Sequence, residues 1–357
     1  MSDFMIDGHK MLWHMDRVLE QKRTGAAAPL YLEVSPVGYC NHDCIFCGKD
    51  FAKKSESRLD ADLFIRRIEE LASVGLRSIM YAGEGEPFLL KELPEIIKFT
   101  KQKGIDVAVT TNGSVGSPEH WRKVLPYLTW LRFSVDAANG STYSKVHGVT
   151  PDAFDKTLRN ISNAVSVKKE MNLPVTLGAQ FLIIEENKSE ITRAIDVFSS
   201  LGIDYLAFKP YSLNPSMINK RDEIYTRAFI ESVSQRIAQL QNSTKMKIIF
   251  RREAMEKYMS GKHFFTSCHA LPYWGYVCSN GDFYTCPVFI GDERFRIGNI
   301  NDTPIRDMIL SDKRRRNIEY AEKALKIGEE CRLNCRMSRI NEFLEFLYDK
   351  PEHINFI

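Results

Sequence analysis

Three cysteines in one short stretch constrain this chain more than any other feature of its sequence. Cys40, Cys44 and Cys47 fall within residues 40–48, shortly after the apolar run 30–34. The apolar run predicts a strand, so the cysteines occupy the loop after it. Thiolate sulfur is the ligand of iron–sulfur clusters, in which each iron usually takes one cysteine. Three local cysteines therefore fit three irons of a 4Fe–4S cluster and leave the fourth iron open.

A zinc site or a set of disulfides fits the same stretch less well. Structural zinc sites usually show paired Cys/His couples, which this loop lacks. Three cysteines cannot all pair as disulfides. Three buried structural cysteines that happen to have this spacing remain as the alternative.

Composition is ordinary for a folded protein. The 357 residues are 44% hydrophobic and 27% charged, with a formal net charge of +3, which gives no reason to expect a nucleic-acid partner. No apolar run approaches the roughly 20 residues of a transmembrane helix, and acidic residues stand near the N-terminus where a signal peptide has a basic region. We therefore expect a cytoplasmic protein with no membrane partner, in which cysteines bind metal rather than form disulfides.

Strands and helices alternate between residues 30 and 211. Short apolar runs predict six strands, at 30–34, 78–82, 105–110, 130–135, 175–184 and 205–209. Helical spacing between them predicts helices at 61–74, 93–102, 119–127, 154–171 and 190–201. Such alternation is typical of parallel βαβ units, so the predicted fold class is α/β, a partial (β/α)6 barrel. Ligands of such barrels bind at the carboxyl ends of the strands.

Unusual polar residues stand at those strand ends. After the second strand, residues 83–87 read Gly-Glu-Gly-Glu-Pro, where glycine lets backbone approach a ligand and a carboxylate can bind an ammonium group. Asp136, after the fourth strand, could also simply cap the next helix. The polar residues at the later strand ends are Thr111, Asn112, Ser134, Asp136, Gln180, Lys209 and Tyr211.

A second set of cysteines lies in the C-terminal third. Cys268 and Cys286 flank the segment 274–285, in which Asn-Gly between aromatic and β-branched runs predicts a β-hairpin. Cys331 and Cys335 precede the last predicted helix. Four cysteines can bind all four irons of a second cluster, and a single zinc ion is the alternative.

The first motif resembles the signature of the radical S-adenosylmethionine (SAM) enzymes, CxxxCx(aromatic)C. Phe46 fills the aromatic position. Residues 83–87 are similar to the GGEP segment of that family, with Gly85, Glu86 and Pro87 in register and Glu84 in place of the first glycine.

The resemblance implies a 4Fe–4S cluster on Cys40, Cys44 and Cys47 whose open iron binds the methionine part of SAM. It also implies that the Gly85–Glu86 segment holds the SAM amino group and that polar residues at later strand ends reach the ribose and the carboxylate. The SAM-binding residues expected on this basis are Phe46, Gly85, Glu86, Pro87, Thr111, Asn112, Ser134, Asp136 and Gln180.

The C-terminal region resembles the single-auxiliary-cluster (SPASM/twitch) extension of the same enzymes. Cys268, Gly281 and Cys286 match its Cx12Gx4C pattern, although the pair Cys331 and Cys335 is Cx3C where Cx2C is common. The resemblance implies a second 4Fe–4S cluster on these four cysteines. Helical spacing of apolar residues between about residues 7 and 21 predicts an amphipathic helix with Met11, Leu12, Met15, Val18 and Leu19 on its apolar face. We therefore divide the chain into an N-terminal amphipathic helix (1–29), the barrel (30–245), and a domain of β-hairpin plus helix for the auxiliary cluster (246–357).

The resemblance is greatest to radical SAM dehydrogenases that oxidise a secondary alcohol of an aminocyclitol or sugar to a ketone. It implies a small polar substrate, an auxiliary cluster that accepts an electron, and a reductase partner such as flavodoxin or ferredoxin. Arg251 and Arg252 directly follow a predicted strand at 246–250 and could bind a polar substrate, or could be solvated. The catalytic candidates are Cys278, Arg251, Arg252, Lys209 and Tyr211.

Three alternatives to this dehydrogenase remain. One is a redox-neutral epimerase in which Cys278 donates a hydrogen atom, although a spare buried cysteine is the simpler interpretation of Cys278. The second is a peptide-modifying radical SAM enzyme, and the third is a non-catalytic iron–sulfur electron carrier. The basic run 313–316 is interpreted as a solvated helix face.

Overall fold

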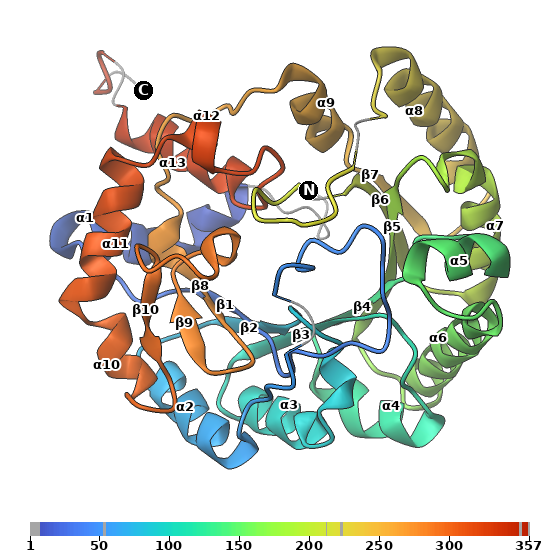
Figure 1. The fold of residues 1–357 in the computed structure, drawn as a ribbon, viewed down its shortest axis with the longest axis horizontal. Coiled ribbons are helices and arrows are strands. Elements are labelled where there is room, and N and C mark those ends of the chain that lie inside the picture. The colour runs from blue at the N-terminus through green and yellow to red at the C-terminus, as the bar shows by residue number, and fades with distance from the viewer. Residues whose placement is uncertain (1–7, 53–54, 212, 222–223, 350–351, 356–357) are drawn as a thin grey trace.

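The computed structural model describes residues 8–52, 55–211, 213–221, 224–349 and 352–355. Its centre is one sheet of ten strands in the order β10-β9-β8-β1-β2-β3-β4-β5-β6-β7. Figure 1 shows helices arranged around these strands. The strands are β1 (Tyr31–Val34), β2 (Ser78–Tyr81), β3 (Asp106–Thr111), β4 (Trp130–Ser134), β5 (Thr176–Ile183), β6 (Tyr205–Pro210), β7 (Lys247–Phe250), β8 (Trp274–Val277), β9 (Asp282–Tyr284) and β10 (Arg296–Asn299).

Strands β1 to β7 are parallel, each paired with the next. Each of the six strands predicted between residues 30 and 209 begins and ends within one residue of its prediction. The predicted α/β partial barrel is therefore confirmed. Because the strands run in one direction, their carboxyl ends share one edge, and the polar residues at those ends gather there.

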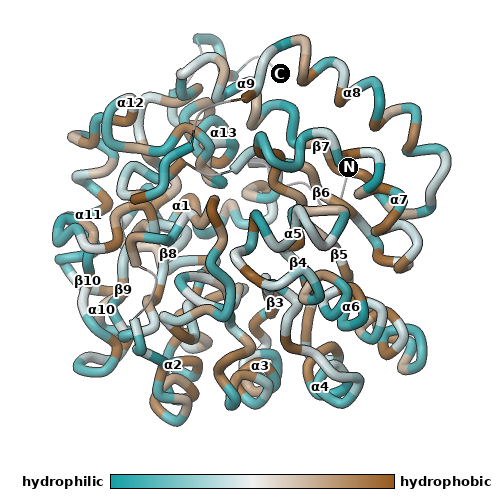
Figure 2. The backbone as a smooth tube through the Cα atoms, turned by 45° about the vertical axis from the view of Figure 1, so that its right-hand side comes forward, coloured by the Kyte–Doolittle hydropathy of each residue, from teal (hydrophilic) through white to brown (hydrophobic). Residues whose placement is uncertain are grey.

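Helices connect the parallel strands, and none in the described part of the chain is long and apolar enough to cross a membrane. Along α8 hydrophobic and hydrophilic residues alternate (Figure 2), and its buried residues are Ile230, Val233 and Ile237. The α-helices are α1 (Met15–Thr24), α2 (Ala61–Ser73), α3 (Leu93–Gln102), α4 (Pro118–Val124), α5 (Gly140–His147), α6 (Asp152–Glu170), α7 (Ile191–Leu201), α8 (Arg227–Gln241), α9 (Arg252–Ser260), α10 (Ile305–Ile309), α11 (Asp312–Lys323), α12 (Ile327–Glu330) and α13 (Ser338–Tyr348).

The N-terminal segment is less regular than predicted. A helix was expected from about residue 7, which lies outside the described residues. The segment forms a 3-10 helix, η1 (Gly8–His14), followed by α1. Met11 and Val18 are buried, whereas Leu12 and Leu19 of the predicted apolar face are exposed. Met11 and Val18 pack in one cluster with Leu344 of α13, so this segment contacts the C-terminal helix.

The C-terminal hairpin continues the barrel sheet. Strand β8 pairs with β1 in parallel, from Tyr31 opposite Trp274 to Val34 opposite Val277. Strand β9 is antiparallel to β8, which confirms the predicted hairpin. The division at residue 245 stays a prediction, and β7, which follows that residue, pairs with β6.

Helices α9 and α13 are joined by two ion pairs. Lys257 of α9 donates to Glu342 of α13 over 2.8 Å, and Arg339 of α13 pairs with Glu253 of α9. These contacts hold the C-terminal helix α13 against α9, the helix that follows β7.

Burial differs between the two faces of the parallel sheet. In β4 the helix-facing residues Leu131 and Phe133 are fully buried, while Arg132 and Ser134 on the inner face are partly exposed. In β6 the inner residue Lys209 is likewise partly exposed between buried neighbours. The inner face is therefore the side on which a ligand can reach the strands.

One residue of the basic run contradicts the prediction of a solvated helix face. Arg314 on α11 is only 1% exposed. Its guanidinium donates to the carbonyls of Ala27 (2.9 Å), Ile309 (3.2 Å) and Pro272 (2.7 Å). Arg314 thus connects the segment before β1 with the segment before β8 and the end of α10.

Candidate functional site

The loop after β1 carries the first three cysteines. Their thiols are partly exposed, on the loop that leaves the carboxyl end of the strand. The Cys40 Sγ accepts a hydrogen bond from the His42 N–H (3.5 Å), and the Cys47 N–H donates to the Cys44 carbonyl (3.2 Å). N–H donors to sulfur are one means by which proteins tune iron–sulfur clusters, so this donor set fits such a cluster.

Glu86 organises the neighbouring strand end. Its carboxylate accepts hydrogen bonds from the Thr111 hydroxyl (2.7 Å) and from the backbone N–H groups of Asn112 (2.7 Å) and Phe88 (3.1 Å). Burial raises the pKa of Glu86. Both oxygens are thus bonded to the protein's own donors, and the carboxylate holds the turn after β3. The expected contact of the 85–87 segment with the SAM amino group stays a prediction.

The turn after β3 is tied to the cysteine loop. The Asn112 side-chain Nδ2 donates to the Asn41 side-chain Oδ1 (2.8 Å), and the Asn41 side-chain Nδ2 donates to the Ser114 hydroxyl (2.7 Å). The Asn112 Nδ2 also lies 3.9 Å from the Cys40 Sγ. Asn41 and Ser114 were missed by the sequence reasoning, although Asn41 stands inside the motif itself.

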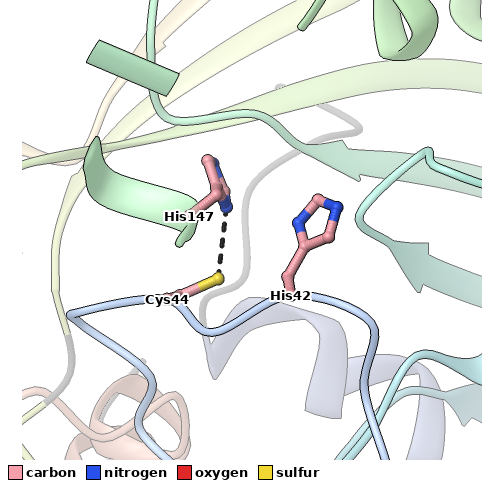
Figure 3. A group of neighbouring side chains, drawn as sticks. All are labelled: His42, Cys44 and His147. Carbon is pink, nitrogen blue, oxygen red and sulfur yellow. Dashed lines mark hydrogen bonds between the residues drawn. The ribbon is translucent and has the colours of Figure 1, made fainter. Parts of the chain in front are cut away.

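Two histidines lie beside Cys44 (Figure 3). The His147 Nδ1 lies 3.2 Å from the Cys44 Sγ. One possible ligand atom from each of His42, Cys44 and His147 lies within 4.8 Å of the other two. The His147 Nε2 is 2.5 Å from the Val135 carbonyl, and burial lowers the pKa of His147 to about 3. A neutral His147 therefore donates from Nε2 and presents its Nδ1 lone pair to the thiol. These histidines give the zinc alternative three ligands, one fewer than structural zinc sites use.

Asp136 and Gln180 place buried oxygens near the ends of β4 and β5. The Asp136 Oδ1 accepts from the Leu182 N–H (2.5 Å), and burial raises the pKa of Asp136 to about 7. The Asp136 Oδ2 and the Gln180 Oε1 have no hydrogen-bond partner among the described residues. Asn139 caps α5 by accepting from the Thr142 N–H, so the helix-cap interpretation of Asp136 is wrong. Ser134 lies opposite Gln180 in the sheet.

The four C-terminal cysteines come together. Burial raises the pKa of Cys331, and Cys335, Cys286 and Cys268 raise it further. The Cys268 Sγ accepts from the Asn341 amide (3.7 Å). Four grouped thiols can hold either a zinc ion or all four irons of a cluster, so the choice between the two metals stays a prediction.

Cys278 lies beside Glu84, which the sequence reasoning gave no role. Glu84 accepts from the Ser279 hydroxyl (2.5 Å) and the Ser279 N–H (3.3 Å). Burial and the adjacent Glu84 carboxylate raise the pKa of Cys278 well above its usual value, so this thiol is neutral.

Lys49 links the two cysteine-bearing regions. It follows Cys47 by two residues, and its ammonium donates to the carbonyl of Pro287 (2.8 Å), which directly follows Cys286. The same ammonium lies 4.4 Å from the centre of the Tyr276 ring. The two predicted cluster loops therefore face each other.

The structure separates the remaining catalytic candidates. Lys209 and Arg251 lie near Arg132 on the inner face. Arg252 is an exposed residue at the start of α9 and pairs with Glu231 and Glu256, at 3.1 and 2.7 Å. Tyr211 is 1% exposed, donates its hydroxyl to the Arg221 carbonyl and lines a cavity with Glu186. Its catalytic role stays a prediction, whereas Arg252 is an exposed, ion-paired residue.

Family models match two parts of the chain. The radical SAM superfamily matches residues 34–198, and the iron–sulfur cluster-binding SPASM domain matches residues 268–336. The first range contains Cys40, Cys44 and Cys47, and the second contains all four C-terminal cysteines.

Curated relatives resemble part of the chain. A probable GTP 3′,8-cyclase from Saccharolobus islandicus (strain M.14.25) is 27% identical over 208 residues, 57% of this chain and 65% of that protein. An AdoMet-dependent heme synthase from Methanosarcina barkeri is 26% identical over 211 residues, 58% of each chain. The chain thus spans less than two thirds of the length of these relatives.

A solved structure shows the same fold. Streptococcus suis SuiB bound to S-adenosylmethionine matches with a TM-score of 0.66 at 18% identity, over 96% of this chain and 80% of that chain. Its fold and the two family matches agree with the parallel sheet, the cysteine loop and the four grouped cysteines. The chain therefore contains a radical SAM domain followed by a C-terminal SPASM/twitch iron–sulfur domain, and these two domains imply 4Fe–4S clusters and SAM as cofactors.

Proposed function

We propose that this enzyme oxidises a secondary alcohol of a small polar substrate, such as an aminocyclitol or sugar, to a ketone. The observation that carries the proposal is the grouping of four C-terminal cysteines beside the inner face of the barrel. Arg336, the residue after Cys335, reaches that face, where its guanidinium donates to the Tyr31 hydroxyl (2.5 Å) and pairs with Glu33 (3.0 Å). A second cluster with four protein ligands has no open iron for substrate, which suits it to accept an electron.

The bound cofactors supply the radical chemistry: SAM and the first cluster provide a 5′-deoxyadenosyl radical that takes a hydrogen atom, and the second cluster accepts one electron. One alcohol and one SAM give one ketone, one methionine, one 5′-deoxyadenosine and one proton, which passes to solvent. A second cluster held by Cys268, Cys286, Cys331 and Cys335 would take up one electron, which would balance the electron that a flavodoxin or ferredoxin supplies. The chain's part is to bind and orient the substrate on the inner face.

A redox-neutral epimerase is the second candidate, and the state of Cys278 favours it. A thiol that donates a hydrogen atom must be protonated, and burial beside Glu84 raises the pKa of Cys278 and keeps its thiol neutral. The second set of cysteines argues for the oxidase, because an epimerase needs no electron acceptor.

Product analysis in deuterated water separates the two candidates. Reconstituted enzyme, SAM and dithionite are incubated with a panel of aminocyclitols and sugars. We expect a ketone in equal amount to 5′-deoxyadenosine, with Cys278→Ala within about threefold of wild type, since removing one small thiol leaves only a small cavity. Deuterium fixed at a product carbon by wild type, and absent with Cys278→Ala, would show an epimerase instead.

Iron content tests the cofactor assignment of the individual cysteines. Anaerobic analysis is expected to give about eight irons per chain, four for each cluster. Replacement of Cys40, Cys44 and Cys47 by alanine should remove about half, and replacement of Cys268, Cys286, Cys331 and Cys335 should remove the other half. A wild-type value near four together with stoichiometric zinc would contradict the second cluster.

A further inference from the structure

Four cations converge on the inner face from separate parts of the chain. Arg132 lies on β4, Lys209 on β6, Arg251 directly after β7, and Arg336 after the last cysteine. Burial lowers the pKa of Lys209 well below its usual value, and the nearby charges of Arg132, Arg336 and Arg251 lower it further. Burial lowers the pKa of Arg251, the charge of Glu253 raises it, and the charges of Arg132 and Arg336 lower it further. Because Phe208 pairs with Phe250, Lys209 and Arg251 follow at neighbouring positions, so the four cations lie in one region.

Counter-charges satisfy only part of this group. Glu33 pairs with Arg336 at 3.0 Å, Asp136 is the carboxylate near Lys209, and Glu253 is the carboxylate near Arg251. Among the described residues, neither the Lys209 ammonium nor the Arg251 guanidinium has an ion-pair or hydrogen-bond partner.

Arg132 is also incompletely satisfied. Its Nη2 donates to the Thr110 hydroxyl (3.0 Å), but its Nε is buried and has no hydrogen-bond partner among the described residues. A buried N–H group without a partner is costly, and Lys209 and Arg251 are partly exposed on the same face. Three cations on one accessible face therefore point to a site whose anionic partner is a ligand.

We propose that Arg132, Lys209 and Arg251 form an anion-binding subsite for a carboxylate or phosphate group of the substrate. This deepens the proposed function, on which it rests for taking the inner face as the substrate site. Guanidinium groups suit either anion because their planar donors match two oxygens at once.

The alternative ligand for these cations is the carboxylate of SAM. Register places the unsatisfied Gln180 opposite Ser134, whereas Lys209 and Arg251 lie on β6 and after β7, at the far end of the parallel strand order from the cysteine loop of β1. We therefore assign SAM to the Ser134 and Gln180 side and the substrate anion to Lys209 and Arg251 on the β6 and β7 side. Arg132, two residues before Ser134 on β4, lies between the two and would bind the anion from the β4 side.

Binding to the reconstituted holoenzyme tests the subsite without turnover. The probes are ribose 5-phosphate for a phosphate and gluconate for a carboxylate, each measured by anaerobic calorimetry against its neutral analogue, ribose or glucitol. We expect one charged probe to bind at least about tenfold more tightly than its neutral analogue, and which probe it is identifies the anion. Failure of both probes to exceed their analogues would overturn the proposal.

Variants separate the subsite from the SAM site. Arg132→Gln, Lys209→Gln and Arg251→Gln should each weaken the charged probe about tenfold or more, the usual effect of losing a charge-assisted hydrogen bond. The matched control is Arg252→Gln, because that neighbouring arginine is exposed on α9. SAM affinity should change less than twofold in all four variants. Loss of SAM affinity with unchanged probe affinity would assign these cations to SAM and contradict the proposal.

Two controls distinguish loss of the anion site from loss of folding. Arg132→Lys retains the charge and should bind the probe better than Arg132→Gln, and the iron content of each variant reports whether it folded. Because no product is measured, anion binding in an enzyme that forms no ketone would contradict the proposed oxidation while leaving the subsite intact. Ketone formation from neutral substrates only, without anion binding, would support the proposed oxidation and contradict the subsite.

Discussion

Replacement of Arg314 by alanine is expected to lower the free energy of unfolding by about 3–5 kcal/mol. The guanidinium is buried and donates to three backbone carbonyls, those of Ala27, Pro272 and Ile309. Each hydrogen bond from a charged donor contributes about 1.5–3 kcal/mol, and burial leaves the freed carbonyls without full hydration. The loss is partly offset because an unpaired buried charge is also removed.

Arg315→Ala is the matched control for this variant. Arg315 is the next residue on α11, its side chain is 47% exposed, and it pairs with Asp312 within the same helix. Exposed pairs of this kind contribute about 0.3–0.5 kcal/mol. Urea unfolding of both variants, prepared anaerobically and followed by circular dichroism, measures the difference. Equal unfolding free energies for the two would contradict the structural role of Arg314.

Gly85→Ala is expected to abolish the first cluster and SAM binding while leaving the second cluster in place. A Cβ atom at Gly85 would lie 2.0 Å from the Tyr39 carbonyl oxygen and 2.7 Å from the Val37 carbonyl oxygen. Both are backbone atoms of the segment that leads to Cys40, and core segments cannot accept a methyl group without displacement. The cysteine loop must therefore move away from the 83–87 segment. Iron should fall from about eight to about four per chain.

Gly328→Ala is the control for the glycine variant. A Cβ at Gly328 on α12 would meet nothing within 4 Å. That variant should retain full iron and SAM affinity. If Gly85→Ala also kept eight irons and wild-type SAM affinity, the prediction that a Cβ at Gly85 displaces the cysteine loop would be wrong.

The parallel strands were predictable because each is a short apolar run between polar turns. Helices α5 and α9 were not predicted. The α5 segment begins at Gly140 and contains serine, threonine and valine, which favour helices weakly, and its start depends on the Asn139 cap. The pairing of β8 with β1 could not be predicted from local sequence patterns, because it joins segments about 240 residues apart.

The candidate site was predictable where motifs are local. All seven cysteines of the predicted cluster sets lie in regions that match the two families. The partners that the fold supplies from a distance were not predictable: His147 reaches Cys44 across 103 residues, and Arg336 reaches Tyr31 across 305. The hydrogen bonds of Glu86 were not foreseen for the same reason, because its partners Thr111 and Asn112 come from the next strand and the turn after it.

The pairing of β1 with β8 also bears on synthesis of the chain. Strand β1 emerges from the ribosome early, and β2 can cover one of its edges soon afterwards. The other edge waits for β8, and at roughly 5–20 residues per second those 240 residues take roughly 12–50 seconds to translate. An uncovered strand edge is a template for pairing with other chains. Nascent chains of this protein therefore depend on protection during that interval, and truncation before Trp274 would leave the edge open permanently.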